Sequence, residues 1–97
     1  MIVLNAYGFL KPEKIADAKA ASKINKARAL ATHGCLRCDY FLSAEEPNKL
    51  VFVEEWATKA DLDSSMAQQG FGEFRSALGP CLEAPSEIRI FDATLVE

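Results

Sequence analysis

The chain begins with an apolar segment, residues 2–9, that is rich in β-branched and aromatic side chains. This composition favours a strand. Both alternating faces of the segment are largely apolar, with Val3, Asn5, Tyr7 and Phe9 on one and Ile2, Leu4, Ala6 and Gly8 on the other. We therefore expect a strand that is covered on both sides.

A helix is predicted from Lys11 and Pro12, since proline is tolerated in a first turn, to His33 and Gly34. Gly34 suits the left-handed position that follows a helix. Apolar residues recur in this range at steps of three or four, which predicts one buried stripe of mostly small side chains: Ile15, Ala18, Ala21, Ile24, Ala27 and Ala31. Such a stripe allows a helix to lie close to a sheet.

Two more strands are predicted over residues 35–42 and 50–56, where apolar and β-branched side chains return. The residues between them contain Pro47 and Asn48, which indicate a turn. A connection this short makes the two strands an antiparallel hairpin.

A second helical region follows the hairpin. Thr58 is typical of an N-cap, and Asp61 three residues later completes a capping-box pattern. Leu62 and Met66 lie one turn apart on a single face. We expect Gly70 to interrupt this helix.

The last part of the chain repeats the change from helix to strand. Phe71, Phe74 and Leu78 form a second apolar stripe, which ends at Gly79 and Pro80. Residues 86–96 are predicted to form the final strand.

The resulting order, β-α-β-β-α-β, is the ferredoxin-like arrangement of the α+β class, with helices on one face of an antiparallel sheet. A chain of 97 residues allows one domain, residues 1–97. The strand faces turned away from the helices are apolar as well. We therefore expect a homodimer in which two sheets pair around a two-fold axis as a dimeric α/β barrel.

Charge and composition narrow the function classes. The net charge of −3 argues against nucleic-acid binding. No run of 18 apolar residues is present, so no membrane-spanning helix is expected. Three cysteines, an odd number, fit a reducing cytoplasm better than a disulfide scaffold. The expected partners are a small molecule and a second copy of the chain.

Trp56, the only tryptophan, stands at the end of a predicted strand. It is either a large core residue or a pocket residue, whose ring would lie against a flat aromatic substrate while its N–H donates one hydrogen bond. Glu54 shares its face of the strand. Beside a buried indole this carboxylate can have a raised pKa and act as a base. The alternative is that Glu54 pairs with a group across the dimer.

Asn5 lies inside an apolar strand, where asparagine is disfavoured. A buried amide needs hydrogen-bond partners. These are either the main chain at a bulge, or the oxygen of a substrate or of bound dioxygen. Tyr7, two residues later, shares the face of Asn5.

Cys35 and Cys38 have the spacing of a metal or redox motif. Residues three apart on a regular strand point to opposite faces, which predicts that these thiols do not share a metal ion. His33, the only histidine, is expected to be exposed or to cap the helix end, with a role as catalytic base as the alternative. Neither a metal site nor a cofactor is predicted.

With these features in this order, the chain resembles the antibiotic biosynthesis monooxygenase (ABM) family over nearly its whole length. The resemblance is carried by short segments of the hairpin and the second helical region: Gly34-Cys35-Leu36-Arg37, Asp39-Tyr40-Phe41, Pro47-Asn48-Lys49-Leu50, Glu54-x-Trp56, Ala60-x-Leu62 and Phe71-x-x-Phe74. It implies a homodimer with a pocket between sheet and helices. It also implies an oxygenase that oxidises a phenolic or quinol substrate without a cofactor.

The resemblance makes Trp56 and Asn5 the candidate catalytic residues. The candidate substrate-binding residues are Tyr7, Glu54, Met66, Phe71 and Phe74.

Two positions depart from the family pattern, because Ser65 and Gly70 stand where members often carry histidine. The histidine that binds iron in haem-degrading relatives therefore has no counterpart, and haem degradation is not expected. Two other functions stay open. One is a non-catalytic dimeric module for ligand binding or stress response, and the other is a lyase or isomerase for a polyketide-like substrate.

Overall fold

The computed structural model describes all residues of the chain, 1–97. Strands and helices alternate in the predicted order, with the second helical region split in two and two short 3₁₀ turns added. The elements are β1 (Ile2–Phe9), η1 (Pro12–Lys14), α1 (Ile15–Leu30), β2 (Cys35–Leu42), β3 (Lys49–Trp56), α2 (Lys59–Met66), α3 (Gln69–Leu78), η2 (Gly79–Cys81) and β4 (Glu87–Asp92).

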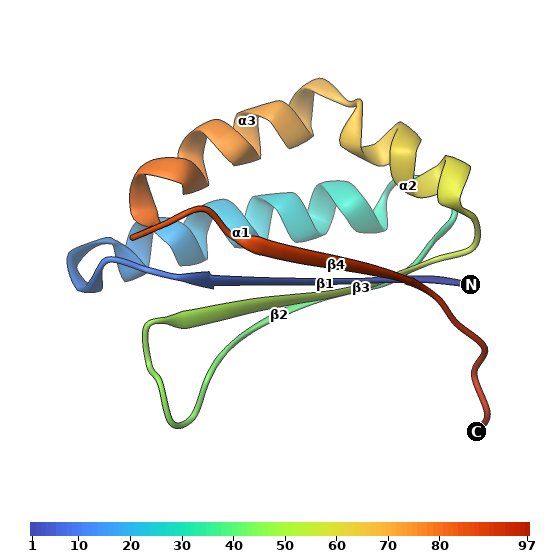
Figure 1. Cartoon of the computed structure of the whole chain (residues 1–97). Coiled ribbons are helices and arrows are strands. Elements are labelled where there is room, and N and C mark those ends of the chain that lie inside the picture. The colour runs from blue at the N-terminus through green and yellow to red at the C-terminus, as the bar shows by residue number, and fades with distance from the viewer.

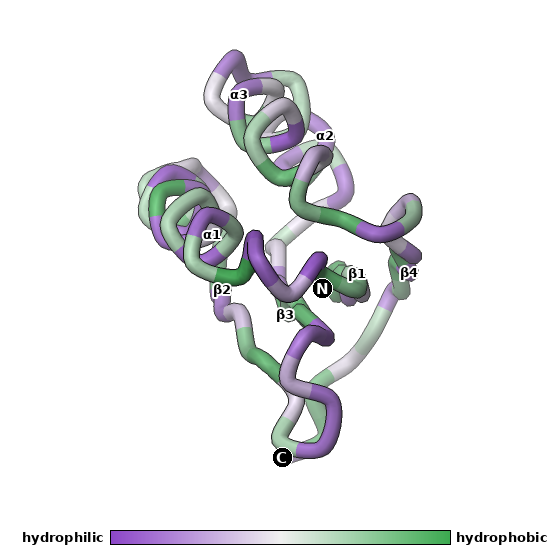
Figure 2. Tube along the Cα trace, turned by 90° about the vertical axis from the view of Figure 1, so that its left-hand side faces the viewer, coloured by the Kyte–Doolittle hydropathy of each residue, from purple (hydrophilic) through white to green (hydrophobic).

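The four strands form one antiparallel sheet in the order β2-β3-β1-β4. The helices all cover the same face of this sheet, and the other face carries none (Figures 1 and 2). The predicted ferredoxin-like α+β fold is confirmed. None of the helices is long and apolar enough to cross a membrane.

The pairing of β1 with β3 determines which side chains face the helices. Leu4 lies opposite Glu54, and Ala6 lies opposite Phe52. Residues directly opposite one another in an antiparallel pair point to the same side of the sheet. These four side chains and Trp56 therefore share the helix-covered face. The intervening residues, Asn5 and Tyr7 on β1 with Val51 and Val53 on β3, point to the helix-free face.

Helix α1 follows the predicted stripe only at its start, where Ile15 packs against the core and Ala18 is buried. Its buried residues are Ala18, Ser22, Asn25 and Ala29, while Ile24 is 72% exposed. The later part of the predicted stripe was wrong because it relied mainly on three-residue steps, and each such step falls about 60° short of a full turn. Residues that follow one another at steps of three therefore move progressively around the helix and away from the sheet. Residues at alternating steps of four and three, from Ala18 to Ala29, stay on the face that packs against the sheet.

The predicted N-cap at Thr58 and the left-handed Gly34 are confirmed, but α1 ends at Leu30 with Ala31 as its C-cap, so Gly34 lies in the turn beyond the helix end and not directly after it. Gly34 has a φ of 84°, a left-handed conformation that glycine adopts without strain. The Thr58 hydroxyl accepts a hydrogen bond from the Asp61 N–H at 3.1 Å and donates one to Asp61 Oδ2 at 2.8 Å. Gly34 and Asp61 also lie against each other, since a Cβ at Gly34 would overlap the Asp61 side chain.

The second helical region is interrupted three residues earlier than predicted. Helix α2 ends at Met66, and α3 begins at Gln69, so Gly70 lies in the first turn of α3 and not at the break. Gln68 adopts an extended conformation there. Gly70 has another use, because a Cβ at this position would lie 2.5 Å from Cδ of Arg28.

Strand β4 is shorter than predicted. It pairs only with β1, from Ile2 opposite Asp92 to Tyr7 opposite Glu87. Beyond Asp92 two further hydrogen bonds join Ala93 to Met1: the Ala93 N–H donates to the Met1 carbonyl, and the N-terminal ammonium donates to the Ala93 carbonyl, each at 2.8 Å. The tail after Ala93 therefore has no strand partner, and β4 is an exposed edge strand.

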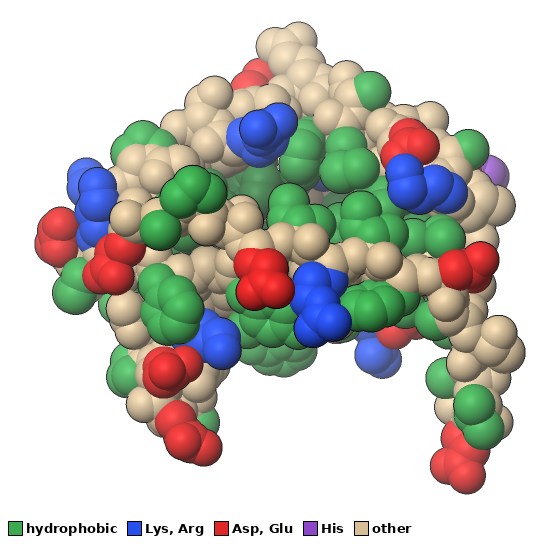
Figure 3. Space-filling model, viewed as in Figure 1, with side chains coloured by type: hydrophobic (Ala, Val, Ile, Leu, Met, Phe, Trp, Pro, Cys, Tyr) green, Lys and Arg blue, Asp and Glu red, His purple; other side chains and the backbone are tan.

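The helix-free face of the sheet presents large apolar side chains to solvent. Phe9, Phe41 and Phe91 point to this side and are 42%, 56% and 40% exposed. The turn of the β2–β3 hairpin and the C-terminal tail both project from the same side, at opposite ends of the sheet (Figures 1 and 3). The structure holds one chain, so the dimeric barrel stays a prediction.

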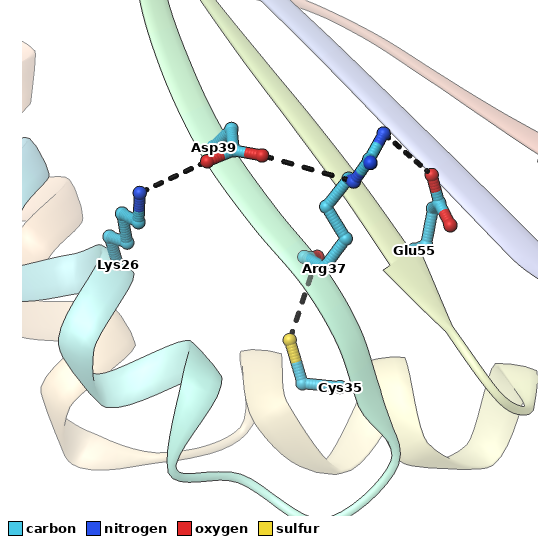
Figure 4. A network of polar contacts seen from close by, with 5 residues as sticks. All are labelled: Lys26, Cys35, Arg37, Asp39 and Glu55. Atoms are coloured by element: carbon cyan, nitrogen blue, oxygen red, sulfur yellow. Dashed lines mark hydrogen bonds and ion pairs between the residues drawn. The ribbon is translucent and has the colours of Figure 1, made fainter.

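A polar network runs from α1 around the edge strand β2 to β3 (Figure 4). Lys26 Nζ donates to Asp39 Oδ1 at 3.0 Å. Arg37 lies 3.9 Å from Asp39 and 3.4 Å from Glu55. These groups are partly exposed, so solvent screens each ion pair and none of them contributes much to stability. Together they place both positive and negative charges along this edge of the sheet.

We expect Gly34→Ala to lower the free energy of unfolding by about 1–3 kcal/mol, because the residue would be held at positive φ. The overlap with Asp61 adds to this loss. Gly72→Ala is the matched control: its Cβ meets no atom and it lies within α3, so it should raise stability by about 0.5–1 kcal/mol. Urea denaturation of both variants measures this, and equal effects of the two would contradict the role of Gly34.

Candidate functional site

A cavity of about 520 Å³ lies between the helix-covered face of the sheet and helices α1 and α3. Its floor comes from β1 and β3, and Ser86 and Ile88 border it on the β4 side. Figure 3 shows hydrophobic side chains around a hollow between α3 and β4. The volume is in the range of sites that bind small organic molecules.

The walls of the cavity are mainly aromatic and apolar. Phe52, Met66, Phe71 and Phe74 all line it. The ring centroids of Phe52 and Phe74 are 5.5 Å apart at an interplanar angle of 65°, and those of Phe71 and Phe74 are 6.3 Å apart. The predicted wall residues Met66, Phe71 and Phe74 are thus brought together, on the side where a flat ligand would find π surfaces.

Glu54 is the only carboxylate that lines the cavity. Its Oε1 accepts a hydrogen bond of 2.9 Å from Nε1 of Trp56, two residues later on the same face of β3. Trp56 is fully buried beside the cavity and does not line it. The indole therefore holds the carboxylate and leaves Glu54 Oε2 without a protein partner.

Burial raises the pKa of Glu54 above its ordinary value, while the hydrogen bond from Trp56 and the charge of Arg28 act against the rise. A carboxylate of raised pKa in an apolar cavity is a stronger proton acceptor than one in water. The arrangement suits general-base chemistry on a weak acid such as a phenol.

Arg28 brings a positive charge to the same cavity from α1. Asn25 Oδ1 accepts from its Nε at 3.2 Å and from Nη2 at 3.0 Å. Its Nη1 donates to Ser65 Oγ at 3.1 Å and to Gln68 Oε1 at 2.7 Å, at the break between α2 and α3. The guanidinium is thus fixed in place, with its carbon 5.7 Å from the centroid of the Phe71 ring.

The sequence analysis did not identify Arg28, Asn25 or Ser65 as site residues. Asn25 and Ser65 are buried, and Arg28 lies one turn after Asn25 on α1. Choosing the correct face of α1 would have placed Asn25 on its buried side, and a buried amide requires hydrogen-bond partners.

Asn5 is not brought together with Glu54 and Trp56. It lies opposite Val53 and Arg89, so it points to the helix-free face. Tyr7 borders the cavity, but strand alternation directs its ring to the helix-free face as well, where Lys49 Nζ lies 5.7 Å from the ring centroid. The main chain of Tyr7, between Ala6 and Gly8, is the part that reaches the cavity.

The two thiols of the Cys35-x-x-Cys38 segment share a face, contrary to the prediction. A bulge between Cys35 and Arg37 adds one residue, so Cys35 lies opposite Trp56 and Cys38 lies opposite Glu54. Burial raises the pKa of Cys38 to about 12, which keeps it a thiol. No group of three or more His, Cys, Asp or Glu side chains is arranged to hold a metal ion.

His33 lies outside the cavity, as the sequence suggested for an exposed residue. Its side chain is 96% exposed, and Nε2 is 4.0 Å from Asp61 Oδ1. No histidine lines the cavity, so the only candidate base in it is Glu54.

The structure is that of a ferredoxin-like α+β protein with a cavity between sheet and helices. A sequence model of the antibiotic biosynthesis monooxygenase (ABM) family matches residues 1–77. This is most of the chain, and the protein belongs to that family. No curated protein matches the sequence.

Solved structures agree with this assignment. A conserved protein from Methanosarcina mazei Go1 is 28% identical, with a TM-score of 0.92 over 96% of this chain and 92% of that one. A structure described as an antibiotic biosynthesis monooxygenase is 25% identical, with a TM-score of 0.90 over 98% and 100%. A Nitrosomonas europaea protein provisionally described in the same way has a TM-score of 0.93 at 22% identity, over 98% and 100%, and supports the fold alone.

The raised pKa of Glu54 predicts a pH-dependent contribution to stability. Between the ordinary value of 4.5 and the raised pKa, the folded protein keeps a proton that the unfolded chain has lost. The free energy of unfolding contributed by Glu54 therefore falls as pH rises through this window. We expect Glu54→Gln to remove this decrease, so that the variant gains stability relative to wild type with rising pH. Chemical denaturation at a series of pH values measures this. A difference in free energy of unfolding between Glu54→Gln and wild type that stays constant over all pH values would contradict the prediction.

Proposed function

We propose that this ABM-family protein is a cofactor-independent monooxygenase or quinol oxidase that acts on a small, electron-rich phenol, with Glu54 as the base. The observation that carries the proposal is the partly buried Glu54 carboxylate, held by Trp56, at the floor of an aromatic cavity. The family assignment of residues 1–77 supports the same reaction class.

Proton removal is the step for which the cavity is suited. A bound phenol would donate its O–H proton to Oε2 of Glu54, which has no protein partner. Phe71 and Phe74 would hold the ring in a fixed orientation and keep water away from it. Ionisation makes the ring electron-rich enough to pass electrons to dioxygen.

The oxidation balances with dioxygen as the only oxidant. A hydroquinone gives two electrons and two protons to dioxygen and becomes a quinone, with hydrogen peroxide as the second product. A phenol with a free para carbon takes one oxygen atom there and loses two hydrogens, becoming a quinone, and the other oxygen atom leaves as water. Glu54 carries the first proton in both courses and is deprotonated again at the end.

Trp56 acts in this proposal through Glu54 and not by contact with the ligand. Its N–H fixes the orientation of the carboxylate and favours the ionised form. Asn5 is left out of the site because its side chain lies on the helix-free face.

We also infer that two copies pair through the helix-free face of the sheet. Phe9, Phe41 and Phe91 expose apolar surface there, and a monomer seldom leaves such surface uncovered. Arg37 and Glu55 lie on the same face, so a copy related by two-fold symmetry can meet each charge with its opposite. All three cysteines are free, which supports a reducing cytoplasm as the setting.

We expect the purified protein to take up oxygen with hydroquinones or dihydroxynaphthalenes above the rate of autoxidation. Glu54→Gln should lower kcat by about 10²–10⁴-fold, since it removes the base and leaves the side-chain volume unchanged. Trp56→Phe, which removes the N–H together with part of the buried ring, should lower it less. An oxygen electrode measures both, with anaerobic incubation and product analysis in parallel.

The matched control is Glu73→Gln, the same change at an exposed position on α3 that does not line the cavity. It should leave uptake unchanged. Substrate binding without uptake would overturn the oxidase in favour of a binding module, and turnover without oxygen would favour the lyase or isomerase.

The dimer is tested by light scattering with size-exclusion chromatography. Wild type should have the mass of two chains, and Phe41→Asp should have the mass of one because it buries a charge in the interface. Ile24→Asp changes an exposed apolar residue on α1 and should leave the dimer intact. Wild type with the mass of one chain would refute the pairing.

A further inference from the structure

Arg28 has one hydrogen-bond donor left over after its protein contacts are counted. A guanidinium carries five N–H groups. Nε and one hydrogen of Nη2 are directed to Asn25 Oδ1, and the two hydrogens of Nη1 are taken by Ser65 and Gln68. The second hydrogen of Nη2 has no protein acceptor, although Arg28 lines the cavity.

This cation stands near the base without being paired with it. None of the hydrogen bonds of Arg28 goes to Glu54, yet its charge favours the ionised form of that carboxylate. Glu54, a proton acceptor, and Arg28, a cation with one N–H group left free, thus line the same cavity. A ligand oxygen that loses its proton to Glu54 becomes an anion, which Arg28 can bind.

The route of the Arg28 side chain shows that its position is defined by the fold. The side chain passes Gly70 so closely that any Cβ there would lie 2.5 Å from Cδ. It then reaches the break between α2 and α3, where Ser65 and Gln68 accept from it. Ordering a long side chain in this way costs entropy before any ligand arrives. Its donor is therefore already oriented when a ligand binds.

We propose that Arg28 binds the ionised oxygen of the ligand, and that the ligands of this cavity are phenols held as phenolates between Arg28 and Glu54. The proposal rests on the function proposed above for its substrate class. It adds the residue that stabilises the anion after proton transfer. Arg28 is then a substrate-binding residue. Its side chain contacts Ser65 and passes close to Gly70, the two positions at which family members often carry histidine.

The test uses 4-nitrophenol, which titrates near neutral pH, changes its visible absorption on ionisation and is too electron-poor to be oxidised readily. Wild-type protein should bind it as nitrophenolate and lower its pKa by about one unit or more. Arg28→Met should abolish this pKa shift and weaken binding of the phenolate about tenfold to a hundredfold. Titration of absorbance against pH, with and without protein, measures the shift.

Two other variants keep the test decisive if Arg28→Met fails to fold. Gly70→Ala keeps the charge but presses on Cδ of Arg28, and it should reduce the pKa shift, whereas Gly72→Ala, whose Cβ meets no atom, should not. Arg75→Gln is the charge control, because Arg75 also lines the cavity but makes no side-chain hydrogen bond or ion pair. It should leave most of the shift in place.

Several outcomes would overturn the proposal: no binding of nitrophenol, binding without a lowered pKa, or a shift lost in Arg75→Gln and retained in Gly70→Ala. The result is separate from oxygen uptake. Nitrophenolate binding through Arg28 in a protein that oxidises no quinol would support Arg28 and reject the oxidase. Oxygen uptake with an unchanged nitrophenol pKa would support the oxidase and reject the role of Arg28.

Discussion

The antiparallel pairing of β1 with β3 is the constraint on which the site depends. The register runs from Ile2 opposite Trp56 to Phe9 opposite Lys49, and a shift of one residue would exchange the two faces of both strands. In the observed register Glu54 and Trp56 lie beneath the helices, where burial gives the carboxylate its raised pKa. The same register turns Asn5 away. A site that combined Asn5 with Trp56 in one cavity is incompatible with it.

The features that the sequence predicted well depend on local rules. Strand alternation, the left-handed Gly34 and the Thr58 cap each involve a few neighbouring residues, and all are present. The errors arose where the outcome depends on a distant partner. The bulge before Arg37 changes the face of Cys35 through pairing with β3, and the end of β4 is determined by the end of β1. Trp56 and Glu54 were found because they lie two residues apart, whereas Arg28 meets Ser65 from another helix.

Arg28 joins two roles that are often carried by different residues. Its hydrogen bonds to Ser65 and Gln68 connect α1 to the break between α2 and α3. The carbonyl of Ser65 is one of its acceptors. The same group balances the buried charge of Glu54, which would be costly in an apolar cavity without a cation nearby. Gly70 makes both roles possible, since a larger residue there would occupy the path of the side chain.

The lining of the cavity comes from two parts of the chain that differ in how deeply they are buried. Residues 1–77 supply the floor, Glu54, Arg28 and the aromatic wall, while Leu82, Ser86 and Ile88 at the mouth belong to the segment after the match. That segment includes β4, an edge strand whose six residues are all exposed and which contacts a single neighbour in the sheet. Substitutions in β4 leave the buried core intact, because none of its residues is buried. A substitution at Ile88 would therefore change the lining of the cavity on its β4 side while the positions of Glu54 and Arg28 stay the same.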